Sequence, residues 1–208
     1  MLKINIKDFN FSRFLEDLKE SDLQRNIMQG GYILDLKVNY EMLECDRSDC
    51  LFHNTLKSYN NALYKLIMGF GDEYINTGLG TGVSRLVRIS KVGNNLIFEF
   101  KPYGTNKRWG VYQTNFVQAL EEFTKAVREY RSICERVIKV VTPDNVEESL
   151  RLLLKEVSWV YEPWFPLAQA WTDYKKQHNI TDEDVKKAIT EEEEKEKKMK
   201  KTWWQVWK

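Results

Sequence analysis

Basic side chains gather in one part of this sequence, between residues 82 and 112. This stretch holds six lysines and arginines against a single acid, Glu99, although the whole chain of 208 residues carries 32 basic and 31 acidic residues. Cations that follow a phosphate backbone, with aromatic rings for unstacked bases, are what binding of single-stranded nucleic acid requires. The pattern favours a binding surface on the following residues, which include one lysine of an earlier strand: Lys37, Arg85, Arg88, Lys101, Tyr103, Lys107, Arg108, Trp109 and Tyr112.

The same basic residues have a second interpretation that needs no ligand. Lysines and arginines on a solvated sheet face keep an exposed edge from pairing with another chain. The net charge of +1 exerts no global pull toward nucleic acid, so a binding function depends on local clustering alone.

A short polar segment contains three side chains of the types that bind zinc. Cys45, Cys50 and His53 follow a C-x4-C-x2-H spacing, and thiolate and imidazole are preferred zinc donors. The spacing matches no closed zinc module, and the odd total of three cysteines argues against a disulfide framework. We therefore expect ordinary thiols and no bound metal.

Catalytic patterns are missing from the sequence. His53 and His178 are its two histidines, and there is no nucleophile elbow, paired-carboxylate pattern or H-E-x-x-H motif. The glycines at 78, 80 and 82 precede a predicted strand, whereas phosphate-binding glycine loops open a helix. The sequence therefore predicts a protein without enzymatic activity and without a cofactor.

Tryptophans at the end of the sequence form a second candidate binding element. Trp203, Trp204 and Trp207 follow a highly charged segment, where large aromatic side chains need a cover. They are candidates for anchoring a partner protein, because tryptophan dominates interface hot spots. The alternative is that they fold back onto the tryptophans at positions 159, 164 and 171.

The elements that must position these residues predict an α+β fold. Residues 32–40 alternate as a half-buried strand, and residues 84–92 and 95–101 form a hairpin around the turn Gly93-Asn94-Asn95. A third strand, 109–113, leads into a long helix that begins near Asn115. We expect an antiparallel sheet of about four strands packed on this helix, with short helices at 11–18 and 56–68.

From Thr142 onward the sequence predicts only helices. Thr142 is followed by Pro143 at a first helical position, a further helix covers residues 167–174, and Thr181 with Asp184 opens the last one. Glutamates four residues before lysines, as in Glu191 and Lys195, are typical of a solvated helix. The predicted organisation is an α+β sheet domain, residues 1–141, and a helical extension, residues 142–208.

The order of the predicted strands and helix resembles a known group of folds. The segments YILDLKVN, SRLVRISKVG, NLIFEFKPYG, RWGVYQ and TNFVQALEEFTKAV are similar in order to the positive-cofactor-four, Whirly and Pur-alpha type of single-stranded nucleic-acid binder. The resemblance implies a four-stranded sheet that holds the nucleic acid strand, usually in a homodimer. It covers about half of the chain. The long insert between residues 41 and 80 and the acid Glu99 depart from it.

The leading hypothesis from the sequence is a non-enzymatic binder of single-stranded DNA or RNA. The competing hypothesis is a protein-directed inhibitor or immunity-type factor, which binds a partner protein through the sheet domain or through the tryptophan-rich tail. The sequence has neither an apolar run of about 20 residues nor an apolar signal core. We therefore expect no membrane span and a cytoplasmic, or host-intracellular, location.

Overall fold

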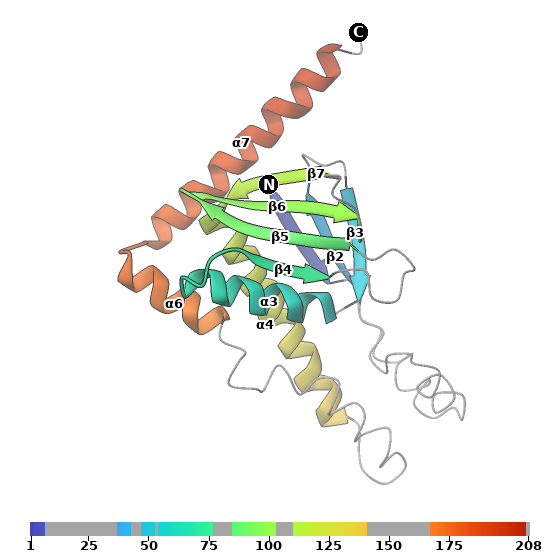
Figure 1. Ribbon diagram of the computed structural model, residues 1–208, viewed down its shortest axis with the longest axis vertical. Helices are drawn as coiled ribbons and strands as arrows, with labels where there is room; N and C mark the ends of the chain where they lie inside the picture. Colours follow the sequence, from blue (N-terminus) through green and yellow to red (C-terminus); the bar gives the residue numbers. More distant parts are fainter. Residues whose placement is uncertain are drawn as a thin grey trace, which may run out of the picture.

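The computed structural model describes residues 1–6, 37–42, 47–52, 54–76, 85–102, 110–140 and 167–206. The described part contains seven strands and four helices (Figure 1). They are β1 (Leu2–Ile6), β2 (Lys37–Met42), β3 (Arg47–Phe52), α3 (Asn54–Ile67), β4 (Glu73–Asn76), β5 (Arg85–Val92), β6 (Asn95–Pro102), β7 (Gly110–Asn115), α4 (Phe116–Val140), α6 (Leu167–Gln177) and α7 (Asp182–Val206). The predicted α+β class is confirmed.

The strands form two antiparallel sheets rather than one. One sheet has the order β1-β2-β3, and the other has the order β4-β5-β6-β7. The strand predicted at residues 32–40 corresponds in part to β2, and residues 32–36 lie outside the described residues. The expectation that this strand shares one sheet with the hairpin was wrong, because β2 pairs with β1 and β3. Alternation reveals a strand but carries no information about its partner.

The fourth strand of the larger sheet is β4, in a segment where the sequence analysis predicts no strand. Its four residues, EYIN, are too few to show a period. The polar segment around Cys50 is likewise not predicted as a strand, but Cys50 lies on β3 and pairs with Asn39. In both places tertiary pairing overrides weak local propensity.

The hairpin between β5 and β6 confirms the predicted turn. Val92 pairs with Asn95, so that Gly93 and Asn94 form a two-residue loop. Gly93 has a φ of +58°, which is the first-position requirement of a type II′ turn and is met best by glycine.

The core lies between the inner face of the four-stranded sheet and the helices α3 and α4. Phe98 of β6 lies 6.1 Å from the ring of Tyr59 of α3, 6.3 Å from Phe123 of α4 and 5.9 Å from Tyr112 of β7. The predicted stripe of α4 is buried here, at Phe116, Leu120, Phe123 and Val127. Helix and sheet each cover the apolar side of the other.

Helix α4 also contacts the smaller sheet through one buried side chain. The amide of Gln118 donates from Nε2 to the carbonyl of Leu2 at 2.7 Å, and the hydroxyl of Thr114 donates to Gln118 Oε1 at 2.9 Å. These bonds satisfy polar groups that would otherwise be buried without partners. They attach β1 to the junction of β7 and α4.

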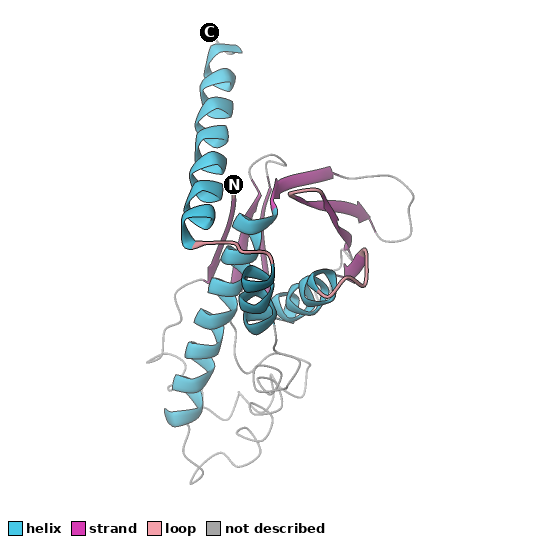
Figure 2. Cartoon of the chain, turned by 90° about the vertical axis from the view of Figure 1, so that its left-hand side faces the viewer, coloured by secondary structure: helices cyan, strands magenta, loops and turns pink. Residues whose placement is uncertain are grey.

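Helix α7 crosses this junction and then extends away from the rest of the described chain (Figures 1 and 2). Ala188, Glu192 and Glu196 are buried at a spacing of four residues, so one stripe of the helix is not solvated as predicted. Glu192 lies 3.4 Å from the hydroxyl of Thr114 and accepts a bond from Lys195 at 2.7 Å. Among the described residues, no helix has both the length and the apolar character that crossing a bilayer requires.

Candidate functional site

One row of side chains crosses the outer face of the four-stranded sheet. The register pairs Tyr74 with Arg88, Arg88 with Glu99 and Glu99 with Val111, so these four residues, here called the outer row, lie on successive strands β4 to β7. Their neighbours in sequence, Val87 and Phe98 for example, point into the core. Alternation along a strand therefore puts the outer row on the opposite face.

The outer row combines exposed apolar groups with a paired arginine. Tyr74 is 54% exposed and Val111 is 42% exposed, and they stand at the two edges of the sheet. Between them, Arg88 donates from Nε to Asp72 Oδ2 at 3.0 Å and from Nη1 to Glu99 Oε2 at 3.2 Å. Cross-strand pairing of this kind orders the middle of the row.

The ion pairs neutralise the charge of Arg88. The hydrogen bonds to Asp72 and then to Glu99 raise the pKa of the Arg88 guanidinium further above its ordinary value. Glu99 itself is only 7% exposed. Among the described side chains, the two carboxylates offset the one guanidinium, so Arg88 does not supply the unpaired positive charge that the sequence predicted.

Seven of the eight remaining predicted nucleic-acid-binding residues divide into two groups. Lys37, Arg85 and Lys101 lie on β2, β5 and β6, but their side chains are outside the described part. Tyr103, Lys107, Arg108 and Trp109 lie outside the described residues altogether. The structure therefore brings none of these seven side chains into a described site.

Tyr112 requires a correction. It was predicted to stack on bases, but its side chain is fully buried, with its ring beside that of Phe98. In the register of β6 and β7, Tyr112 pairs with Phe98, which already belongs to the core face. A residue in this position has no surface to offer a base.

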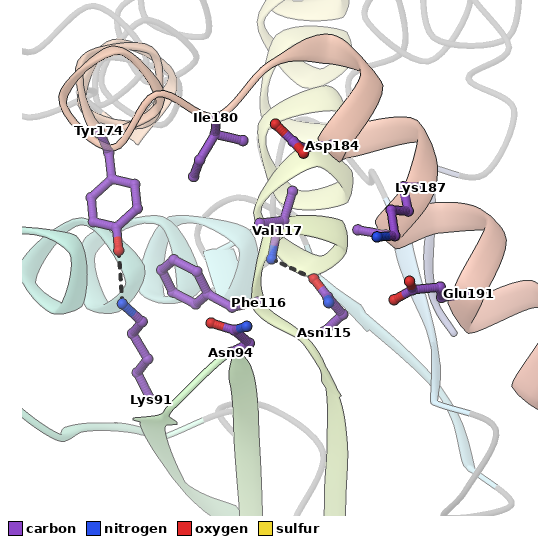
Figure 3. A pocket seen from close by; sticks show the side chains of 11 residues that line it. Lys91, Asn94, Asn115, Phe116, Val117, Tyr174, Ile180, Asp184, Lys187 and Glu191 are labelled. Atoms are coloured by element: carbon purple, nitrogen blue, oxygen red, sulfur yellow. Dashed lines mark hydrogen bonds between the residues drawn. The ribbon is translucent and has the colours of Figure 1, made fainter.

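An open hollow forms a second candidate site, which the sequence did not indicate. It measures about 430 Å³ and lies where the β5–β6 turn, the start of α4, the end of α6 and the first turns of α7 meet (Figure 3). Lys91 reaches into this region from β5 and donates to the hydroxyl of Tyr174 at 2.7 Å. Because its walls come from four separate segments, no local pattern could have predicted it.

The candidate tail residues lie at and beyond the end of α7. Trp203 and Trp204 belong to the last turns of this helix, with side chains outside the described part, and Trp207 lies outside the described residues. A continuous helix rises about 1.5 Å per residue, so residue 203 lies roughly 30 Å from the start of α7. Figures 1 and 2 show that this end of α7 points away from α6.

The backbone of α7 therefore does not fold back onto Trp171. Trp171 is instead buried against α4, where its Nε1 donates to Glu121 Oε1 at 2.7 Å and its ring lies 6.2 Å from that of Phe116. The other proposed acceptors of the tail, Trp159 and Trp164, lie outside the described residues.

No group of three or more metal-binding side chains occurs within the ranges that the structure describes. Cys45 and His53 lie outside these ranges, and Cys50 is described only by its backbone, so the zinc interpretation is not addressed. Comparison with family models, with curated proteins and with solved structures finds no match for this chain.

Proposed function

We propose that this chain is a non-enzymatic interaction protein of the inhibitor or immunity type, and that the outer row binds a partner protein. The observation that carries the proposal is the arginine of the row, which is held between Asp72 and Glu99 while Tyr74 stands exposed beside it. Tyrosine and arginine are the residues that protein interfaces concentrate, especially where aromatic and aliphatic groups flank them.

The charge of this surface favours a protein over a phosphate backbone. Among the described side chains, Asp72 and Glu99 already pair with Arg88, so a phosphate brought to the same place would have to compete with two carboxylates for this cation. Removing water from an apolar rim with a neutral centre costs little free energy, because the arginine keeps its hydrogen bonds when water leaves.

Binding of single-stranded nucleic acid is the second candidate function. The specific observation in its favour is the sequence excess of cations, of which Arg85, Lys101, Lys107 and Arg108 have side chains beyond the described part. In this candidate function, the contact lies at the start of β5, at the end of β6 and on the segment between β6 and β7, and not on the outer row.

Site-specific photo-crosslinking tests both candidates in one experiment. The photoreactive residue p-benzoylphenylalanine replaces Tyr74 in the outer row, and in a matched control it replaces Arg128, which is exposed on α4. After irradiation in the cells that produce the protein, we expect a discrete adduct from position 74 that protease removes and nuclease does not.

Two outcomes would contradict the proposal. Equal adduct patterns from positions 74 and 128 would mean that the outer row has no specific partner. An adduct sensitive to nuclease would favour the second candidate, and alanine at both Lys107 and Arg108 should then flatten the salt dependence of binding to an unstructured oligonucleotide.

A further inference from the structure

The open hollow beside Lys91 lies on the opposite side of the four-stranded sheet from the outer row. Lys91 shares the alternation of Val87 and Ile89, which face the core, whereas Arg88 faces outward. The volume of about 430 Å³ falls within the range of small-molecule sites. Its walls combine apolar groups with charged ones, which is the composition that such sites share.

Lys91 is the charge of this hollow that contacts its aromatic side chains. Its ammonium lies 4.5 Å from the ring centre of Phe116 and 5.2 Å from that of Tyr174, and it donates to the Tyr174 hydroxyl. The Tyr174 ring lies in turn 5.7 Å from Trp171 and 4.0 Å from His178. The ammonium therefore lies near the Phe116 ring, where cation–π attraction favours it, and at the hydroxyl edge of Tyr174.

The ammonium of Lys91 makes no ion pair within the described part of the chain. Its contacts are with neutral groups, and two of its three protons remain for a ligand after the bond to Tyr174. An ammonium that contacts an aromatic ring and a hydroxyl, and has no carboxylate partner among the described residues, is available to bind an anion.

Further donors line the same hollow. Asn115 uses its Oδ1 to accept from the backbone amides of Val117 and Gln118, which leaves its amide NH₂ for another acceptor (Figure 3). Lys187 of α7 adds a second ammonium on the far wall. Asp184 is already used by Thr181, so Glu191 at the edge is the one acid of the lining without such a partner in the described structure.

We propose that this hollow binds a small amphipathic organic anion, whose acidic head lies at Lys91 and whose apolar body lies along the chain segments that supply Val117, Ile180 and Ala188. Lys91, which has no carboxylate partner among the described residues, selects an anionic head, and charge-assisted hydrogen bonds from an ammonium are the stronger kind. The site is independent of the proposed protein partner, since it lies on the other face of the sheet.

A pair of fluorescent probes isolates the contribution of the charge. Anilinonaphthalene sulfonate is an amphipathic aromatic anion, and phenylnaphthylamine is its uncharged counterpart. In Lys91→Met, we expect the affinity for the sulfonate to fall by about tenfold, while the affinity for the amine changes by less than about twofold. The matched control Lys139→Met, exposed on α4, should alter neither affinity.

Several results of the probe experiment would overturn the proposal. Equal sulfonate affinities in the Lys91 and Lys139 variants would overturn the proposal, as would a parallel loss for both probes. If Lys91→Met lowers the melting temperature, the exposed Lys187→Met serves instead, and it should weaken the sulfonate selectively. Displacement of the sulfonate by octanoate or by phenyl phosphate would identify a carboxylate or a phosphate head, and failure of both to displace it would overturn the proposal.

Discussion

Arg88 shows how the meaning of a single residue depends on what lies across the sheet from it. In the sequence it is one of six cations in a basic stretch, but in the structure it is bonded to Asp72 and to the buried Glu99. Asp72 lies sixteen residues earlier in the chain, before β4. The role of Asp72 could not be inferred from the sequence, because β4, the strand that brings Asp72 near Arg88, was not predicted.

The pairing of Arg88 leads to a prediction about stability. Arg88→Met should lower the melting temperature, because it removes the guanidinium that is bonded to the nearly buried Glu99 and puts an apolar side chain in its place. The double variant Arg88→Met/Glu99→Leu should recover most of the loss, since both charges then leave together. Thermal unfolding followed by circular dichroism measures this cycle, and strictly additive losses in the single and double variants would contradict the coupling.

Lys91 is a second residue whose contacts could not be inferred from the sequence. The sequence counted it with the basic stretch, yet three residues beyond Arg88 it lies on the other face and contacts Tyr174 of α6. Period-two alternation separates Arg88 from Lys91 once β5 is known. The contact with Tyr174, 83 residues away, is a property of the folded chain alone.

Helix α7 begins at a capping box that the sequence predicted. The backbone amide and the hydroxyl of Thr181 both donate to Asp184 Oδ2, at 2.9 Å and 2.7 Å, and the amide of Asp184 donates back to the Thr181 hydroxyl at 3.2 Å. These bonds from Thr181, amide first and hydroxyl second, lower the pKa of Asp184 below its ordinary value of 3.8. The box is local in sequence, so it could be recognised without the fold.

The lowered pKa of Asp184 gives its stabilising effect a definite pH dependence. The effect is fully present above the ordinary value and is lost as the pH falls through the lower value of the folded state. We expect wild type to melt at a higher temperature than Asp184→Asn at pH 7, with the difference shrinking below about pH 4. Asp182→Asn is the matched control in the same helical turn, and a difference that stays constant down to pH 2 would refute this account.

Helix α6 connects the C-terminal helices to the same core as the sheet. Leu167 and Trp171 are buried in the cluster that contains Phe98 and Phe123. Lys175 and Trp171 both donate to Glu121 Oε1 of α4, each at 2.7 Å. The boundary expected at residues 141–142 separates a described helix from residues outside the described part, but the core itself continues across it.

A shared core predicts that the whole molecule unfolds in one step. Trp171→Ala should lower the free energy of unfolding by about 3–5 kcal/mol, as expected for removing a fully buried tryptophan. Urea unfolding followed by far-ultraviolet circular dichroism and by tryptophan fluorescence should give coincident transitions in wild type and variant. Two separated transitions, with only the helical one affected, would instead support an independent helical extension.

The sequence by itself determined the elements whose signals are local. Three features depend on residues only a few positions apart: the β5–β6 hairpin with Gly93, the apolar stripe of α4 and the capping box of α7. The spacing of these residues is therefore sufficient to predict the features. Only the tertiary structure decided which strands share a sheet, which cations are neutralised and where Lys91 meets Tyr174. Those outcomes depend on register and on packing between distant segments, for which spacing within one segment carries no information.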